Sequence, residues 1–293
     1  MRIATMDVGT NSTRLLITEI GESPCPVQLY QAINTTRIGE GMANNHGLLT
    51  PVAIQRTVQA LMEFSAIAAK FSVDKLRVVA TAAVRDALNG RELVELAQAK
   101  AGLEVKVISG EQEARLSYLG VIKGLAEVPP AAVVIDVGGG STEFIWPSGE
   151  GRLAVESVPI GAVRATEAEL NEQQISLMLE KVLSRVAKAR PQKVIGVGGT
   201  ATTLAAMNLG LELYDAAQVH GYSLKKVEVN SWHRKLSAAS PDQRKLIPGL
   251  QPQRADIILA GVTIMKIILD KLGLEQLMVS ETDLLWGLIF EEI

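Results

Sequence analysis

The sequence contains 293 residues with a formal net charge of −3, 47% hydrophobic residues and 21% charged residues. This balance is typical of a globular protein long enough for two domains, and the lack of a basic excess argues against nucleic acid as a partner. The single cysteine, Cys25, excludes an internal disulfide framework and favours a reducing compartment, for which we expect the cytoplasm. The pattern of a signal peptide is missing because Asp7 interrupts the first apolar stretch, and no apolar run reaches the roughly 18 residues of a membrane span.

The first half of the sequence begins with a predicted β-hairpin. Strands are expected over Arg2–Val8 and Thr13–Glu19, and the turn between them lies in the stretch Asp7-Val-Gly-Thr-Asn-Ser-Thr13. The other elements expected in this half are a strand at 28–38, a glycine-rich loop at 39–47, a helix from the N-cap Thr50 to about Lys70, a strand at 76–81, a helix at 89–100, a strand at 103–108 and a helix at 111–122.

The second half repeats this order after a crossing segment at 124–130 that ends in Pro129-Pro130. An apolar strand at 131–135 leads into Asp136-Val-Gly-Gly-Gly-Ser-Thr-Glu143, so the pattern Asp-Val-Gly-x-x-Ser-Thr recurs 129 positions later (136 − 7 = 129). Further expected elements are a strand at 153–159, helices at 175–189 and 201–207, a strand at 193–197 that ends in Gly198-Gly199-Thr200, helices at 225–236, 242–247, 254–271 and 281–291, and a strand at 276–279.

The two Asp-Gly turns predict phosphate-binding loops. Glycines let the backbone approach a ligand closely, and successive backbone N–H groups in such a turn form a concavity that suits phosphate oxygens. Asp136 and Glu143 bracket the second turn with carboxylates, which is compatible with phosphate mainly if a divalent cation lies between them. Two similar α/β halves that face each other would bring these turns to one interdomain cleft.

Five stretches, in this order, resemble the exopolyphosphatase / guanosine pentaphosphate phosphohydrolase family of the actin/sugar-kinase superfamily. They are Asp7–Arg14, Ala80–Asp86, Ile108–Arg115, Asp136–Glu143 and Gly196–Thr200; Val219–Leu224 and Arg254–Asp256 also fit the family pattern. The resemblance implies an α/β fold of two duplicated ribonuclease-H-like domains. We expect these domains at 1–123 and 124–280, with a C-terminal helix at 281–293 that packs back on the first.

The resemblance also implies a reaction and a set of site residues. The expected reaction is Mg²⁺-dependent hydrolysis of a terminal phosphoryl group, with Mn²⁺ as an alternative metal. The substrate would be inorganic polyphosphate, with short chains favoured, or guanosine pentaphosphate (pppGpp). The chain resembles the short family members because it ends at residue 293, and no additional domain would extend the channel. We expect Glu113 as the general base and Arg85 as a catalytic phosphate contact, Asp7, Asp136 and Glu143 as metal ligands, and Gly9, Asn11, Ser12, Thr81, Gly138, Gly139, Gly140, Ser141, Gly198, Gly199 and Thr200 as phosphate-binding residues.

Several alternatives stay open. Glu111 competes with Glu113 for the role of base, although the family pattern aligns Glu113. Leu285 and Trp286 stand where the family often has an Arg-acid pair, which puts one phosphate or interdomain contact in doubt. The seven Lys and Arg residues from Lys225 to Arg254 form either a solvated face or a track for a polyanion. A sugar or acetate kinase, a binding protein without turnover for polyphosphate or guanosine tetraphosphate, and a homodimer are further options, whereas no membrane partner is expected.

Overall fold

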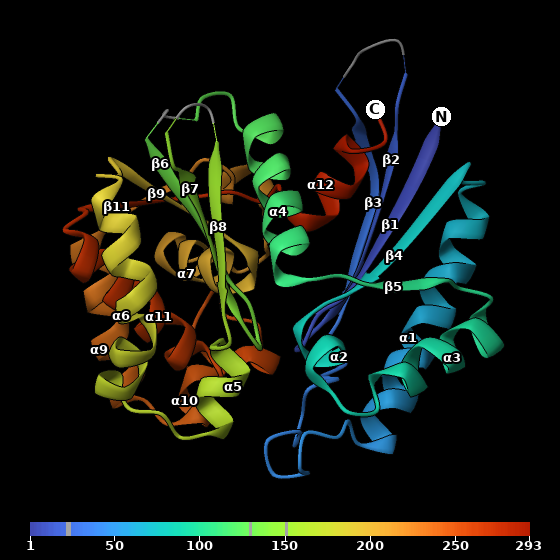
Figure 1. Ribbon diagram of the computed structural model, residues 1–293, viewed down its shortest axis with the longest axis horizontal. Coiled ribbons are helices and arrows are strands. Elements are labelled where there is room, and N and C mark those ends of the chain that lie inside the picture. The colour runs from blue at the N-terminus through green and yellow to red at the C-terminus, as the bar shows by residue number, and fades with distance from the viewer. Residues whose placement is uncertain (22–24, 129–130, 150–151) are drawn as a thin grey trace.

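The computed structural model describes residues 1–21, 25–128, 131–149 and 152–293, and it contains two β-sheets, each covered by helices (Figure 1). The first sheet has the strand order β3-β2-β1-β4-β5, with β1 pairing antiparallel to β2 and parallel to β4. Its strands are β1 (Arg2–Val8), β2 (Thr13–Glu19), β3 (Val27–Asn34), β4 (Lys75–Ala80) and β5 (Val105–Val107).

The second sheet has the order β10-β11-β9-β6-β7-β8. Read as β8-β7-β6-β9-β11, it reproduces the order of the first sheet, with two antiparallel pairings followed by parallel ones. The predicted α/β fold of two duplicated ribonuclease-H-like units is therefore confirmed. The strands are β6 (Ala132–Val137), β7 (Thr142–Pro147), β8 (Leu153–Val158), β9 (Lys193–Val197), β10 (Ser223–Lys225) and β11 (Gln276–Val279).

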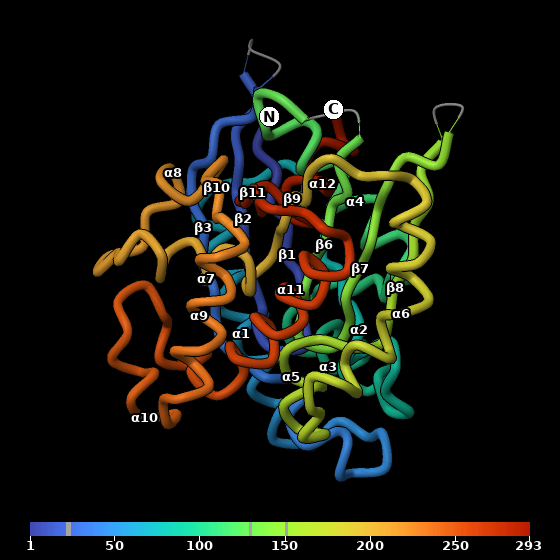
Figure 2. Tube along the Cα trace, turned by 90° about the vertical axis from the view of Figure 1, so that its left-hand side faces the viewer, coloured from blue at the N-terminus to red at the C-terminus, as the bar shows by residue number. Residues whose placement is uncertain are grey.

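The inner strands β1, β2, β6 and β7 are buried on both faces, which explains their nearly continuous apolar sequences, whereas the edge strands β3 and β8 are only partly buried. In β1, Ala4 and Met6 join the core beneath helices α1 (Pro51–Lys70) and α3 (Gly90–Ala101), whereas Ile3 points to the other face. In the second half, α11 (Ile258–Leu272) lies between α9 (Lys226–Ala238) and α6 (Glu172–Lys188), as Figure 2 shows from that side. The remaining helices are α2 (Ala82–Asp86), α5 (Ala162–Glu167), α7 (Gly198–Leu209), α8 (Ala216–Val219), α10 (Pro241–Arg244) and the 3-10 helix η1 (Pro252–Arg254).

Two helices exchange halves. Helix α4 (Gly110–Gly124) follows the first sheet in the sequence but packs on β7 and β8 of the second, where Ala114 and Val121 contact its core. Helix α12 (Leu284–Phe290) follows the second sheet but packs on β1 and β2 of the first, with Leu285 and Ile289 in that core. The two helices cross between the sheets (Figure 1).

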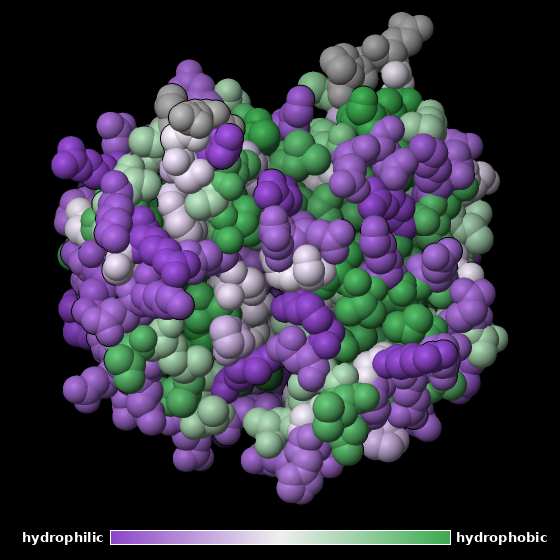
Figure 3. All heavy atoms as spheres, in the orientation of Figure 1, coloured by the Kyte–Doolittle hydropathy of each residue, from purple (hydrophilic) through white to green (hydrophobic). Residues whose placement is uncertain are grey.

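The opposite end of the molecule carries polar contacts between the halves. Arg37 pairs with Asp256 at 2.7 Å, and Arg164 pairs with Asp86 at 2.6 Å. The carboxylate of Glu167 accepts a hydrogen bond of 2.9 Å from the backbone N–H of Gly41. Hydrophilic and hydrophobic residues are interspersed over both halves on the face shown in Figure 3. The two halves therefore meet at both ends of the space that separates the sheets.

Some predicted boundaries were wrong. Helix α7 begins at Gly198 rather than at residue 201, and β3 ends at Asn34 rather than at residue 38. The short elements α2, α5, α8 and β10 were not expected as helices or strands. The predicted crossing at Pro129-Pro130 lies outside the described residues. No helix within the described ranges is both long and apolar enough to cross a bilayer.

The crossing of α4 and α12 depends on two glycines. A Cβ on Gly287 would collide with the backbone of Leu116 in α4, and one on Gly120 would collide with the backbone of Asp283. We expect Gly287→Ala to lower the free energy of unfolding by about 1 to 3 kcal/mol, because the helices must separate to admit the methyl group. Chemical denaturation measures this change, with Gly21→Ala as the control, since a Cβ on Gly21 has nothing within 4 Å. Equal stability of the two variants would contradict the packing described here.

Candidate active site

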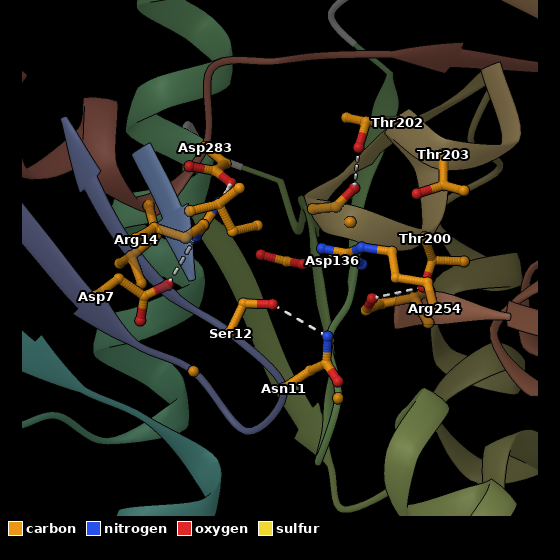
Figure 4. A pocket seen from close by; sticks show the side chains of 18 of the residues that line it. Asp7, Asn11, Ser12, Arg14, Asp136, Thr200, Thr202, Thr203, Arg254 and Asp283 are labelled. Atoms are coloured by element: carbon orange, nitrogen blue, oxygen red, sulfur yellow. Dashed lines mark hydrogen bonds and ion pairs between the residues drawn. The ribbon is translucent and has the colours of Figure 1, made fainter. Parts of the chain in front are cut away.

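The two Asp-Gly turns face each other across the junction of the halves (Figure 4). Each turn closes in the same way, with Gly9 N–H donating to the carbonyl of Ser12 and Gly138 N–H donating to that of Ser141, both at 3.0 Å. The turns are in direct contact, since a Cβ on Gly139 would lie 2.9 Å from the Cβ of Thr10. The duplicated sequence pattern therefore forms one composite site.

The repeat differs in the charge that faces each aspartate across its hairpin. Asp7 lies opposite Arg14 in the β1–β2 register, whereas Asp136 lies opposite Glu143 in the β6–β7 register. Opposite charges in such a cross-strand pair are favourable, and like charges are destabilising. The first turn is thus internally neutralised, but the second holds two buried carboxyl groups side by side.

Arg14 also ties the first hairpin to the segment that precedes α12. Its guanidinium donates to Asp7 Oδ2 through Nη2 at 2.7 Å and forms a short contact with Asp283 (Figure 4). Both carboxylates are buried, so the loss of Arg14 would leave uncompensated buried charges at the junction. Burial nevertheless raises the pKa of Asp7, and its Oδ1 has no hydrogen-bond partner among the described residues.

Glu113 lies in the first turn of α4, which begins with a capping box between Ser109 and Gln112. The helix crosses onto the second half, which brings this carboxyl group to the charges around Glu143 and Asp136. Arg85 donates through Nη1 to Glu113 Oε2 at 3.0 Å and also to the carbonyl of Ile108 at 3.2 Å. Arg85 therefore orients the Glu113 carboxylate from the side of the first half.

The acidic cluster of Glu113, Asp136 and Glu143 binds protons more tightly than isolated carboxylates do. Burial raises the pKa of Glu113 well above its ordinary value, and the charges of Glu143 and Asp136 raise it further, while Arg85 opposes both effects. Burial, followed by the charge of Glu143, raises the pKa of Asp136 to about 7. Burial also raises the pKa of Glu143, against hydrogen bonds from Ser141 and Ser157. Such a cluster favours either bound protons or a cation.

A third turn, Gly198-Gly199-Thr200, lies beside Asp136. Gly198 has φ of +74°, and a Cβ there would collide with the Asp136 carboxylate, so only glycine suits this position. A Cβ on Gly199 would likewise collide with the guanidinium of Arg254, which lies against this turn. The Nε of Arg254 donates to the side-chain oxygen of Gln251 at 3.2 Å. Within the described residues Arg254 has no acidic partner, and burial together with the charge of Arg14 lowers its pKa to about 10. It is therefore an uncompensated cation that can bind an anion.

A cavity of about 690 Å³ connects these groups. Its lining includes Glu113 and Asp136 as well as Arg254, Tyr214, Gln251 and Glu281. Its lining includes most residues expected from the sequence, namely Asp7, Gly9, Asn11, Ser12, Thr81, Glu113, Asp136, Gly138, Gly139, Gly140, Ser141, Gly198, Gly199 and Thr200.

Five residues expected in the site make contacts within the protein. Arg85 and Glu143 are not among the residues that line the cavity, and Arg85 donates to Glu113. The N–H groups of Gly9 and Gly138 are used within their own turns. Thr200 donates its hydroxyl proton to the carbonyl of Val137 at 3.0 Å, which leaves only its oxygen lone pairs for a ligand.

The site residues expected from the sequence do not include Arg14, Arg254 or Asp283. Arg254 was expected in the basic run that begins at Lys225, and it is the member of that run that lines the cavity. Arg244, by contrast, is buried and donates to the carbonyls of Leu236 and Ala255, which is a structural role. A signal for Arg254 was its place in the family-like stretch Arg254–Asp256.

The carboxylates fit a metal ion only in part. No three Asp, Glu, His or Cys side chains in the described part of the chain are placed to hold one ion together, so Asp7, Asp136 and Glu143 do not form a single ligand set. Mg²⁺, however, usually takes one or two protein carboxylates and completes its shell with water and phosphate. The like-charged pair Asp136 and Glu143 is compatible with that smaller set.

Known proteins are similar to this chain over nearly its whole length. The profile of the Ppx/GppA phosphatase family matches residues 16–293. Exopolyphosphatase 2 of Mycobacterium tuberculosis is 33% identical over 311 residues, which covers 98% of this chain and 97% of that protein. A bifunctional 3-dehydroquinate synthase/phosphatase of Fusobacterium nucleatum is 31% identical, and the alignment covers 99% of this chain but only 46% of that protein.

Solved structures show the same similarity. A Ppx/GppA family member of Aquifex aeolicus has 33% identity and a TM-score of 0.82, and the alignment covers 100% of this chain and 97% of that one. An exopolyphosphatase of Cytophaga hutchinsonii has 27% identity and a TM-score of 0.90, with the same coverage.

The raised pKa of Asp136 predicts a pH-dependent stability. The pKa of Asp136 in the folded state is about 7, above the ordinary value of 3.8. The protonated carboxyl group therefore adds to the free energy of unfolding. This contribution is fully present below the unfolded-state pKa and is lost as pH rises through about 7. Asparagine carries no charge at either pH, so the free energy of unfolding of Asp136→Asn should not fall with this titration. We expect the difference in free energy of unfolding, Asp136→Asn minus wild type, to increase by about 2 kcal/mol between about pH 5 and pH 8.

Chemical denaturation with a metal chelator present measures this difference. The control is Asp215→Asn, because Asp215 is exposed, has a lowered pKa and stays ionised across the window. A pH-independent difference for Asp136→Asn would show that Asp136 is not held in the protonated form.

Proposed function

The chain belongs to the Ppx/GppA phosphatase family, and from that premise we propose that it is an exopolyphosphatase that releases terminal orthophosphate from inorganic polyphosphate. The observation that carries the proposal is the placement of Glu113, a buried carboxyl group with a raised pKa at one end of a cavity lined by phosphate-type turns. The relatives named exopolyphosphatase, matched over nearly their whole length, support the choice of substrate.

In the proposed reaction, Glu113 acts as the general base. A water molecule forms a bond from its oxygen to the terminal phosphorus and gives its proton to the Glu113 carboxylate. The bridging P–O bond breaks, and its electron pair leaves with the shortened chain. Burial and the neighbouring carboxylates raise the pKa of Glu113, which makes its carboxylate a stronger base than an ordinary glutamate. Arg85 keeps the carboxylate oriented.

The turns and Arg254 would bind the phosphates. Within the described residues, the N–H groups of Gly139 and Gly140 donate to no protein acceptor and line the cavity. Ser12 accepts a hydrogen bond of 3.0 Å from the side chain of Asn11, so its own hydroxyl proton remains for a ligand. These donors suit the terminal phosphoryl group, and Arg254 suits the next phosphate, which becomes the leaving group.

We also propose that Mg²⁺ serves this reaction, held by Asp136 and Glu143 either directly or through water. Bound there, the ion would neutralise charge that develops on the phosphoryl oxygens. The cross-strand pairing of these two carboxylates supports the assignment, because the charges of Arg14 and Arg85 offset their mutual repulsion only in part. In Asp7, Arg14 already holds Oδ2, which leaves Oδ1 for an ion.

Guanosine pentaphosphate is a second candidate substrate. Beyond Arg254 the cavity is lined by hydroxyl, amide and phenol groups of Thr202, Gln251 and Tyr214. Such neutral groups suit a nucleoside better than a row of phosphates. The ratio of kcat/KM for pppGpp and for inorganic polyphosphate distinguishes the two substrates.

The test of the base compares two neighbouring glutamates. The wild type should release orthophosphate from polyphosphate with Mg²⁺, and Glu113→Gln should lower kcat by about 100-fold or more while polyphosphate still binds. Glu111→Gln is the control, because Glu111 is exposed on the same helical turn and pairs with Arg115. A normal kcat in Glu113→Gln would remove this residue from the mechanism, and loss of activity in Glu111→Gln alone would transfer the role to Glu111.

The proposed metal site is tested without turnover. Mg²⁺ should raise the thermal midpoint of the wild type at about pH 8, since a ligand that binds only the folded state stabilises it. Asp136→Asn and Glu143→Gln should each reduce that rise, whereas Asp215→Asn should retain it. An unchanged rise in both site variants, measured by differential scanning calorimetry, would place the ion elsewhere.

A further inference from the structure

Glu281 lines the far part of the cavity and has no role in the reaction described above. Its carboxylate accepts a short hydrogen bond from the hydroxyl of Tyr214, and its backbone N–H donates to His220 Nδ1 at 3.1 Å. The ring of His220 also contacts the carbonyl of Gly124, at the end of α4, at 3.2 Å. Both the backbone and the side chain of Glu281 are therefore held in place.

Glu281 and Glu113 lie in different parts of the same cavity. The charged groups that shift the pKa of Glu113 are Glu143, Asp136 and Arg85, whereas those that act on Glu281 are Asp283 and Arg14. Tyr214, which contacts Glu281, also senses the charge of Arg254 and bonds with Thr202, one turn along α7 from the Gly198-Gly199 turn. Close approaches therefore connect Asp136 with Arg254 through the Gly198-Gly199 turn, and Tyr214 lies between the charge of Arg254 and the carboxylate of Glu281.

The charges along this path are unusual for a polyanion. Among the described residues that line the cavity, five are acidic and two are cationic. Arg14 is already paired with Asp7 and Asp283, which leaves Arg254 as the cation available to a phosphate. A phosphate that extends from Arg254 towards Tyr214 would be repelled by the carboxylate of Glu281, because no further cation lines this cavity among the described residues.

We propose that Glu281, positioned by Tyr214 and His220, is a specificity-determining residue that disfavours phosphate chains extending past Arg254. The inference rests on the proposed exopolyphosphatase function and adds to it a physical limit on chain length. Like-charge juxtaposition is a common way to reject a wrong ligand, because it penalises that ligand without strengthening the right one. Short chains end before Glu281 and avoid the penalty.

The titration of Glu281 makes this selection sensitive to pH. Burial and the charge of Asp283 raise the pKa of Glu281 to about 7, while the hydrogen bond from Tyr214 and the charge of Arg14 oppose the rise. The carboxyl group is therefore neutral below about pH 7 and repels phosphate above it. Discrimination against long chains should increase between about pH 6 and pH 8.

The test is Glu281→Gln, which removes the charge and keeps an oxygen that accepts from Tyr214. We expect the ratio of kcat/KM for long-chain polyphosphate to that for tripolyphosphate to rise about fivefold or more at about pH 8. In the wild type this ratio should fall as pH rises, and in Glu281→Gln it should be nearly constant. Taking the ratio cancels the titration of Glu113 and Asp136, because both substrates react at the same terminal site.

Two further variants separate this charge effect from others. Glu212→Gln removes an exposed charge near Tyr214 but outside the cavity lining, and it should leave the ratio unchanged. Tyr214→Phe removes the hydrogen bond that positions Glu281 and lowers its pKa, so it should weaken discrimination against long chains at about pH 8. Equal ratios in wild type and Glu281→Gln, or the same rise in Glu212→Gln, would overturn the proposal.

The failure of this inference is distinct from failure of the proposed function. If the wild type releases no orthophosphate from tripolyphosphate or from long chains, the exopolyphosphatase assignment fails, and the selection inferred for Glu281 fails with it. If both substrates are hydrolysed and the ratio does not respond to Glu281→Gln, the inferred selection alone is wrong.

Discussion

The central feature of the structure is the electrostatic repulsion between three buried carboxyl groups that the fold holds close together. Asp136 and Glu143 face each other across a hairpin, and helix α4 adds Glu113 to the same place. A hairpin needs no such pair, as the first copy of the repeat shows by placing Arg14 opposite Asp7. The cost of the cluster is tolerated because it creates proton-binding and cation-binding capacity next to three phosphate-type turns.

The rest of the fold holds that cluster in position. The exchange of α4 and α12 joins the sheets through a close helix crossing, which requires glycine at positions 120 and 287. Arg14 links the first hairpin to the start of α12, and Arg85 holds Glu113 from the first half. At the opposite end, the pairs Arg37–Asp256 and Arg164–Asp86 join the two halves again. The acidic cluster therefore depends on contacts that join the two halves. A change in the relative position of the halves would alter the geometry of the cluster.

Much of this arrangement was predictable from the sequence because duplication is visible in it. The repeated Asp-Val-Gly pattern and the order of strands indicated the two similar halves, and the glycine turns indicated most of the cavity lining. The contact of Arg85 with Glu113 was not predicted, because a sequence does not show which way a guanidinium points. Arg254 and Glu281 were missed because each becomes significant only through tertiary contacts, with Gly199 and Tyr214 respectively. The local sequence pattern is therefore enough to predict the turns. Which charged side chains face one another depends on the folded arrangement and cannot be predicted from the sequence alone.

The most direct measurement is a carboxyl titration followed by NMR of protein labelled with ¹³C at the Asp and Glu side chains. The account predicts that Glu113 and Asp136 titrate far above the roughly pH 4 of ordinary carboxyl groups, and that Mg²⁺ moves both titrations to lower pH. Ordinary titration of both groups, unaffected by Mg²⁺, would contradict the claim that a strained acidic cluster forms the centre of this site.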